Sequence, residues 1–280
     1  MRKTLYIAAF FLSVLLGFSS CTERIDIKLD GTYTRLVVDG VITSDAKKHR
    51  IKLSTTTDYF YNQPAPAVRN AIVTINDGTN TLLLTENPLL PGIYETNEDF
   101  FGVAGKTYKL EIQLSSPING KSNYEAFSEM PDVNPIDSIR LKYIPHWEGV
   151  AIQAYAQDPI GVNFYMFNVF KNSVLLTDTL NKVSITDDKL FDGNYTNGIP
   201  VAFLDQKNVR EKINPGDTIT LQIAGITGAY YYFVTDLQTD AGFSNPLFGG
   251  PPANVRGNIN NGAIGFFAAY SVRYGSIIAR

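Results

Sequence analysis

Strict alternation of apolar and polar side chains is the dominant pattern in this chain of 280 residues. It is clearest over residues 108–114 and 219–223, where every second side chain is apolar. A period of two is typical of a strand with one buried face. Segments of similar character, separated by Gly, Pro and Asn, predict further strands at 35–43, 50–56, 68–75, 81–85, 123–130, 138–144, 151–156, 164–171, 201–204 and 263–272.

One stretch has the period of a helix instead. Between residues 229 and 241, apolar side chains recur at the i, i+3, i+4 and i+7 spacing of a single helix face. Thr227 is suited to cap the start of this helix, and Gly242 stands where a helix commonly ends. A second, shorter helical turn is predicted near residues 206–210.

The best internal boundary lies between Met130 and Pro135, where two prolines within five residues interrupt strands and helices alike. The pattern therefore predicts a mainly β protein with two domains. We expect both to be β-sandwiches of immunoglobulin-like or transthyretin-like type, at residues 26–131 and 136–280. The second is expected to carry the packed helix at about 229–241.

The N-terminus has the order of a secretory signal. Residues 1–20 contain a basic head, an apolar run and then small residues, and Cys21 follows directly. This arrangement resembles the lipobox of bacterial lipoproteins, which implies that Cys21 is lipidated and that residues 21–25 form a tether. The alternatives are an ordinary signal with a chance cysteine, or a short membrane anchor. The apolar run is shorter than the roughly 20 residues that a spanning helix needs.

Composition narrows the classes of function. The formal net charge is −3. It becomes −5 when residues 1–20 are removed, because this segment contains the two bases Arg2 and Lys3 and no acid. A mildly acidic chain without a basic run gives no electrostatic reason to expect nucleic-acid binding. Cys21 is the only cysteine, so a lipidated chain cannot form an internal disulfide. Its stability must then come from the core.

Catalytic and metal-binding patterns are sparse. The only histidines, His49 and His146, both read as surface loop residues, and no zinc-ligand spacing is present. Acidic side chains between Asp187 and Asp192, with Asn194 nearby, could supply oxygen ligands to calcium, but the spacing is not that of an EF-hand and an acidic turn is the preferred interpretation. We therefore predict no catalytic residue, no metal and no cofactor.

Aromatic side chains are numerous, with 16 Tyr and 17 Phe. Exposed tyrosines are common at interfaces and sugar sites, because they combine contact area with a hydroxyl group. The candidate binding surface is Tyr59, Tyr61, Trp147, Tyr231 and Tyr232. The alternative, which we favour for most of these side chains, is that they cap the core of a sandwich.

Several motifs occur together in an informative order. Residues 36–42 read LVVDGVI, 71–75 AIVTI, 105–108 GKTY, 130–131 MP, 135–138 PIDS and 216–218 GDT, and the C-terminal part contains GFSNPLF at 242–248, PPANVRGNI at 251–259 and NGAIGFFAAYSV at 261–272. Together with the lipobox, this order resembles the lipoprotein family called domain of unknown function 4249. The Asn261–Gly262 pair is interpreted as a tight turn into the last strand, and Gly265 as a point of close backbone approach.

The resemblance implies an outer-membrane lipoprotein of the Bacteroidota, on a membrane side that the sequence leaves open. We expect a non-catalytic accessory or binding subunit of a TonB-dependent receptor that imports a nutrient. The alternative is a stand-alone protein that captures a glycan or peptide, which would need a concave aromatic patch rather than a broad flat one. A hydrolase is less well supported, because neither histidine has a recognisable catalytic partner.

Overall fold

The computed structural model describes residues 34–57, 63–241 and 255–280. These described residues belong to one compact unit. Its largest sheet has nine strands, in the order β12 (Val174–Leu175), β11 (Phe164–Lys171), β15 (Thr218–Ile226), β16 (Ile264–Ile278), β1 (Leu36–Thr43), β2 (Arg50–Thr55), β6 (Ile93–Glu95) and β5 (Thr85–Glu86), with β13 (Ser184–Asp187) also paired to β11.

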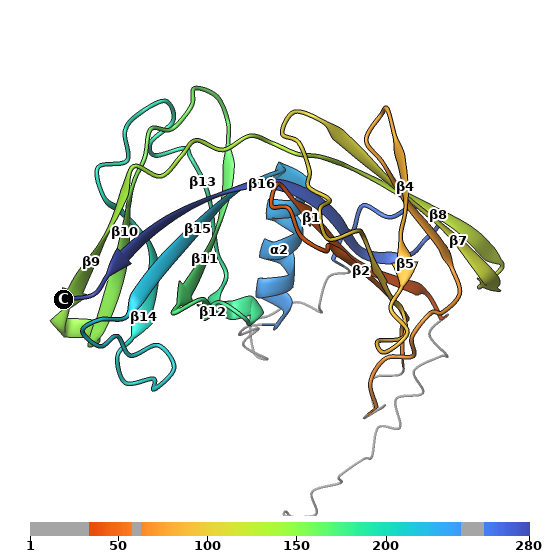
Figure 1. The fold of residues 1–280 in the computed structure, drawn as a ribbon, viewed down its shortest axis with the longest axis horizontal. Helices are drawn as coiled ribbons and strands as arrows, with labels where there is room; N and C mark the ends of the chain where they lie inside the picture. Colours follow the sequence, from red (N-terminus) through yellow and green to blue (C-terminus); the bar gives the residue numbers. More distant parts are fainter. Residues whose placement is uncertain (1–33, 58–62, 242–254) are drawn as a thin grey trace, which may run out of the picture. The chain divides into compact units, whose positions relative to one another are not determined.

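Two smaller sheets pack against different parts of this long sheet (Figure 1). The four-stranded sheet has the order β4 (Thr81–Leu83), β3 (Ile72–Asn76), β7 (Thr107–Ile118) and β8 (Lys121–Glu129). The three-stranded sheet has the order β14 (Ile199–Asp205), β10 (Gly149–Tyr155) and β9 (Ser138–Ile144). Two short 3-10 helices, η1 (Pro145–Trp147) and η2 (Leu180–Lys182), lie between strands of the second half. The protein is thus mainly β with sandwich-like layers, as the alternating pattern predicts.

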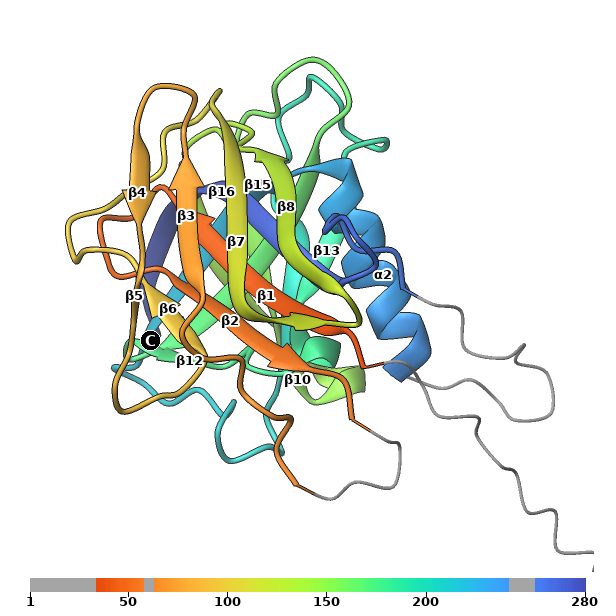
Figure 2. The same ribbon diagram turned by 90° about the vertical axis from the view of Figure 1, so that its right-hand side faces the viewer.

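We call the two layered regions the N-terminal and C-terminal sandwiches. The N-terminal sandwich places the four-stranded sheet over β1, β2, β6 and the first half of β16, around a core that includes Leu36, Ile51, Tyr108 and Phe267. The C-terminal sandwich places the three-stranded sheet over β11, β15 and the second half of β16. Figure 2 shows the four-stranded sheet lying across β1 and β2.

Strand β16 belongs to both sandwiches. Residues Val37–Thr43 of β1 pair with Ile264–Tyr270 in parallel, and Ser271–Ile278 pair with β15 in antiparallel fashion. The remaining strands divide at the proline-rich segment near residue 132, but the chain returns to the N-terminal sandwich through β16. Residues 26–131 alone would therefore lack part of their own core, including Phe267 and Ala269.

The close approach at Gly265 makes the parallel pairing possible. Gly265 has a φ of +98°, and a Cβ atom there would overlap the Val38 carbonyl oxygen. The adjacent Asn261–Gly262 pair has positive φ at both residues, as expected for the tight turn before β16. Nearby, Asn258 donates to the Phe127 and Phe267 carbonyls at 3.0 and 2.8 Å and accepts from the Phe267 amide at 2.9 Å. The described part of the C-terminal motif thus joins β16 to β8.

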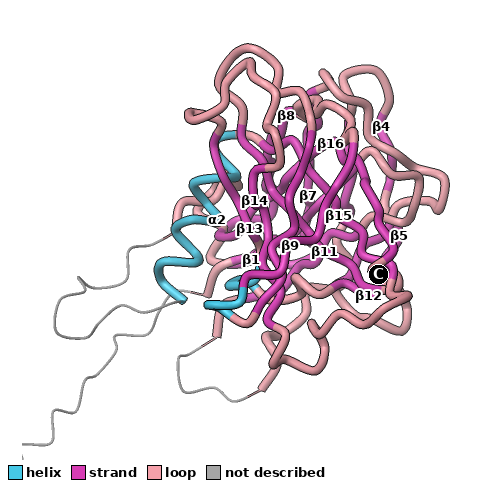
Figure 3. Tube along the Cα trace, turned by 90° about the vertical axis from the view of Figure 1, so that its left-hand side faces the viewer, coloured by secondary structure: helices cyan, strands magenta, loops and turns pink. Residues whose placement is uncertain are grey.

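The single α-helix of the described residues, α2, spans Gly228–Ala241, in agreement with the helical period. Thr227 caps it, because its Oγ1 accepts from the Tyr230 amide at 3.2 Å. Tyr230 and Phe233 pack on Phe266, with ring centroids 5.1 and 4.9 Å apart. Figure 3 shows this helix along one side of the strands. Near the short helical turn expected at 206–210, the chain forms hydrogen-bonded turns, one of them closed by the Lys212 amide donating to the Asn208 carbonyl at 2.8 Å.

Candidate functional site

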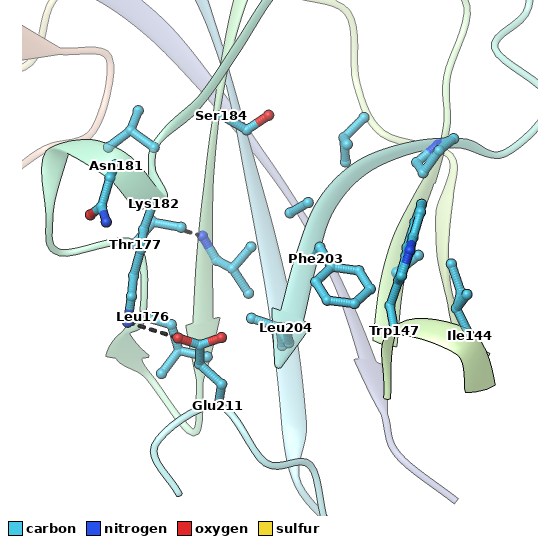
Figure 4. A pocket seen from close by; sticks show the side chains of 16 residues that line it. Ile144, Trp147, Leu176, Thr177, Asn181, Lys182, Ser184, Phe203, Leu204 and Glu211 are labelled. Atoms are coloured by element: carbon cyan, nitrogen blue, oxygen red, sulfur yellow. Dashed lines mark hydrogen bonds and ion pairs between the residues drawn. The ribbon is translucent and has the colours of Figure 1, made fainter. Parts of the chain in front are cut away.

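A cleft opens in the C-terminal sandwich between β14 and the segment from β12 to β13. Its volume is about 520 Å³, which lies within the usual range for sites that bind small molecules. The floor is apolar, and the two walls differ in character (Figure 4). The lining residues are Ile144, Trp147, Ala151, Val169, Leu176, Thr177, Asn181, Lys182, Val183, Ser184, Pro200, Val201, Ala202, Phe203, Leu204 and Glu211.

One wall is aromatic. Trp147 ends the short helix η1 and is 63% exposed, and Phe203 on β14 is 42% exposed. Their rings meet edge to face, with centroids 5.7 Å apart and planes at 81°, which is a favoured arrangement for aromatic pairs. Gly149 on β10 lies beneath Phe203, and a Cβ atom there would overlap the Phe203 ring. The glycine therefore allows the ring to lie against the strand, so the wall is positioned by packing.

The opposite wall is polar. The Nζ atom of Lys182, on η2, lies 2.7 Å from Oε1 of Glu211. Glu211 is only 7% exposed. The second oxygen of Glu211 accepts from the Asp205 amide at 2.9 Å, and Asn208 donates to the first at 3.0 Å. Glu211 thus has its charge balanced by Lys182 and its oxygens occupied by hydrogen bonds. Exposed Asn181, next to Lys182, adds an amide group at the rim.

Helix α2 supports the polar wall from behind. Gln238 donates to the carbonyl oxygens of Leu180 and Val183, both at 2.8 Å. Leu180 is the first residue of η2 and Val183 follows its last, so α2 fixes the backbone that carries Asn181 and Lys182. Deeper in the cleft, Thr177 accepts from the Val169 amide at 3.2 Å and donates to Asn168 at 2.9 Å. Hydrogen bonds from Gln238 and among the lining residues therefore hold the cleft in shape.

The lining residues of this cleft combine aromatic and polar chemistry. It offers two exposed rings on one side and amide, hydroxyl and ammonium groups on the other. Among the lining residues Glu211 is the only carboxylate, and neither described histidine lines the cleft. Glycoside hydrolysis usually requires two carboxyl groups that face each other across the substrate. The lining residues do not provide that pair.

The structure brings few of the sequence-predicted aromatic residues together. Trp147 lines the cleft, whereas Tyr231 and Tyr232 lie on α2 and pack near Phe164 at ring distances of 5.0 and 6.2 Å. Tyr232 is 58% exposed, but neither tyrosine lines the cleft. Cys21, Tyr59 and Tyr61 lie outside the described residues.

Sequence reasoning missed Phe203, Lys182 and Asn181 as site residues. Phe203 belongs to a segment that reads simply as a strand, and its proximity to Trp147 results from the pairing of β14 with β10. The available signal was Gly149 beside Trp147, because a glycine opening a strand can mark a place where a ring or ligand approaches closely. Nothing local in the sequence indicates that η2 lies across the cleft from Trp147 and Phe203.

The expectation that His49 is a surface residue is wrong. His49 is only 3% exposed, and its ring meets Phe100 edge to face. Its Nε2 lies 3.0 Å from the Thr43 hydroxyl, whereas its Nδ1 has no hydrogen-bond partner among the described residues. Burial, followed by the nearby Lys47, lowers the pKa of His49 from 6.5 to about 4. His146, in contrast, is exposed as expected.

The acidic segment folds into a cluster with a different membership from the one considered in the sequence. Carboxylate oxygens of Asp158, Asp188 and Asp192 lie within 4.8 Å of one another. They accept hydrogen bonds from Gly193, Asn163 and Gly161 at 2.7–2.9 Å. Burial raises the pKa of Asp158. These bonds account for the cluster as a tie between loops. The side chain of Asn194 donates to the nearby Asp192 carbonyl.

Among the described residues, none of the helices combines the length and hydrophobicity needed to cross a membrane.

The comparisons identify the family. The family model described as domain of unknown function (DUF4249) matches residues 22–275, so this chain belongs to that family. No curated protein matches the sequence. A solved structure from Bacteroides uniformis ATCC 8492, provisionally named a carbohydrate-binding protein, aligns with 87% of this chain and 98% of its own at 11% identity. Its TM-score is 0.24, so this alignment carries no argument about fold or ligand.

Proposed function

We propose that this protein is a non-catalytic binding protein that captures a neutral oligosaccharide in the cleft between β14 and η2. The observation that carries the proposal is the pair of exposed rings, Trp147 and Phe203, opposite the polar groups of Asn181 and Lys182. Flat aromatic faces contact the apolar faces of sugar rings, and amide and ammonium groups donate to sugar hydroxyls. Such a mixture is typical of a site that must bind an amphipathic ligand.

The balance of charge favours a neutral ligand. Lys182 and Glu211 form an ion pair, so this wall presents little net charge. An anionic ligand would have to compete with Glu211 for Lys182, and a cationic one would have to displace Lys182. A peptide is the competing ligand, because β14 is an edge strand and an extended peptide can add to such an edge.

The proposal is non-catalytic because the one carboxylate of the cleft is committed to structure. Glu211 accepts bonds that hold the turn after β14, and it is nearly inaccessible to solvent. A general acid or base must lie within hydrogen-bond reach of the group on which it acts. Glu211 has its oxygens directed to protein donors, so it stabilises the wall rather than serving a reaction.

The location proposed for this binding protein is the outer membrane, through lipid on Cys21. The support is the signal-like order of residues 1–20 and their small residues before Cys21. A second candidate role, as an accessory subunit of a TonB-dependent nutrient receptor, is compatible with the first. Confinement at a membrane raises the effective concentration of a partner, so a modest affinity suffices.

The test is a binding screen with the full-length protein purified in detergent. Neutral oligosaccharides and short peptides are screened on arrays, and each positive compound is measured by calorimetry. We expect neutral oligosaccharides to bind, and Phe203→Ala to weaken binding at least about tenfold, as removal of a central aromatic contact usually does. The matched control is Phe127→Ala, because Phe127 is 56% exposed on the other sandwich.

Two outcomes would contradict the proposal. Binding of peptides alone would replace the proposed ligand class with the competing one. Equal loss of affinity in Phe203→Ala and Phe127→Ala would show that the cleft is not the site. Circular dichroism of each variant distinguishes a loss of binding from a loss of fold.

A further inference from the structure

Three aliphatic side chains at the tips of two neighbouring loops are highly exposed. Ile160 is 92% exposed, Val162 73% and Leu190 95%. The first two lie in the loop between β10 and β11, and the third lies in the loop between β13 and β14. Both loops project at the upper left of Figure 1. We call these three side chains the loop-tip cluster.

The two loops are tied together by hydrogen bonds. Asp192 accepts from the Gly161 amide at 2.8 Å, Asp188 from the Asn163 amide at 2.7 Å, and Asp158 from the Gly193 amide at 2.9 Å. Backbone bonds between Asp158 and Asn194, and between Asp188 and Asn163, add to this set. The Tyr165 hydroxyl, at the start of β11, donates to Asp158 at 2.6 Å. Ties between the two loops therefore hold the tips in one conformation.

A rigid display of aliphatic side chains requires an explanation. Exposed apolar atoms gain no stability for the folded chain, and single exposed side chains are common on monomers. Here three of them share one pair of loops whose geometry is set by hydrogen bonds between the loops. Binding to a preorganised surface loses less conformational entropy than binding to a mobile one. We propose that the loop-tip cluster is a docking site that inserts into an apolar socket on a partner protein.

The charge of the two loops indicates which residues should surround the socket on the partner. Residues 156–163 and 188–198 contain the acids Asp158, Asp188 and Asp192 and the single base Lys189, whose Nζ lies 2.7 Å from Asp187. Asp158 and Asp188 are buried and Asp192 is exposed, so the loops carry a net negative charge at and just beneath their apolar tips. Electrostatic complementarity therefore predicts lysine or arginine around the partner's socket. The same negative charge disfavours an anionic lipid surface, so a protein is the better fit than a membrane.

This inference rests on the receptor-accessory part of the proposed function, and it is independent of the oligosaccharide. No residue of the loop-tip cluster lines the cleft. A failure to bind sugar would leave the docking site standing, and a failure of docking would leave the cleft standing. The two surfaces can therefore be tested separately in the same protein.

The first step of the test is photo-cross-linking in intact cells that express the full-length chain. Benzoylphenylalanine replaces Leu190 in one variant and Val209 in a matched control, because Val209 is 87% exposed on a different loop. We expect the Leu190 position to give one discrete protein adduct that the Val209 position does not give. Mass spectrometry then identifies the partner, and the proposal requires an apolar socket with a basic rim at the cross-linked peptide.

The second step measures affinity between the two purified proteins. Each of Ile160→Ser, Val162→Ser and Leu190→Ser is expected to weaken binding about tenfold, in line with the loss of a buried anchor, whereas Val209→Ser leaves it unchanged. The association rate should also fall as salt is added. Adducts to lipid, equal adducts at both positions, or unchanged affinity in the triple variant would overturn the proposal. Unchanged thermal unfolding confirms that the variants fold.

Discussion

The two sandwiches share one long sheet, and the candidate binding cleft lies in the C-terminal one. In the N-terminal sandwich, side chains as large as Tyr94, Tyr108 and Phe267 are at most 1% exposed. In the C-terminal sandwich, Phe203 and Trp147 stand at the surface of a cleft. The loops at one end of the same sandwich carry the exposed aliphatic side chains of the loop-tip cluster.

One sheet can thus supply both a rigid support and a binding region. Strand β16 connects the two, because it pairs with β1 in one half and β15 in the other. We therefore expect substitutions in the N-terminal sandwich to act mainly on stability. Substitutions at the cleft and loop tips should act mainly on binding. Variants in the two sandwiches test this division.

Gly265→Val should have the largest effect on stability. The side chain would meet the Val38 carbonyl oxygen at a backbone conformation that disfavours any residue other than glycine. We expect a loss of about 4 kcal/mol or more in the free energy of unfolding in urea. Gly262→Ala is the matched control, since no atom lies within 4 Å of the point that its Cβ would occupy, and it should cost only about 1 kcal/mol. Similar losses in both variants would contradict a steric role for Gly265.

Phe267→Ala and Phe203→Ala compare the same change in the two sandwiches. Phe267 is fully buried, so its loss should cost about 3–5 kcal/mol of stability. Phe203 is 42% exposed, so its loss should cost about 1 kcal/mol or less while it weakens ligand binding. Urea unfolding and calorimetry give the two quantities. A larger destabilisation by Phe203→Ala would show that the cleft wall is mainly structural.

His49 should make the N-terminal sandwich sensitive to acid. Its folded pKa of about 4 lies below the ordinary 6.5, so between these values the unfolded chain binds a proton that the folded chain does not. Stability is therefore lost as the pH falls from about 6.5 to 4, by about 3 kcal/mol in total. Urea unfolding at several pH values should show this slope in the wild type and less of it in His49→Gln. If the wild type and His49→Gln lost stability equally as the pH falls, groups other than His49 would be responsible.

Asn258→Ala should have a smaller effect, because it removes hydrogen bonds rather than core volume. Its side chain makes three bonds that join β8 to β16, and a typical bond contributes about 1 kcal/mol, so we expect a loss of about 2 kcal/mol. Asn194→Ala is the control, since its side chain donates only to the nearby Asp192 carbonyl. Thermal unfolding compares the two. Equal midpoints would mean that the Asn258 bonds add nothing to the junction.

Local patterns predicted most of the elements. The alternation at 108–114 and 219–223 lies within β7 and β15, and the helical spacing after Thr227 matches α2. The strands expected at 138–144 and 164–171 coincide with β9 and β11. Each of these signals arises from side chains a few residues apart, which is the range over which secondary structure is encoded.

Long-range arrangement was not predictable in the same way. The parallel pairing of β1 with β16 joins segments more than 200 residues apart. The burial of His49 depends on Thr43, Thr96 and Phe100, of which only Thr43 lies on an adjoining strand. For the candidate site, the sequence singled out Trp147, but Phe203 and Lys182 join it only through the packing of β14 and η2. The secondary-structure propensities of individual residues carry no information about such long-range contacts.

The most direct test of the binding account uses the chain's single tryptophan. Trp147 is the only Trp in the sequence and lines the cleft, so its fluorescence reports occupancy without a label. The account predicts that a neutral oligosaccharide shifts the emission in a saturable way, and that Phe203→Ala moves the midpoint at least about tenfold higher. An emission spectrum that no neutral oligosaccharide changes, in a folded wild-type protein, would contradict it.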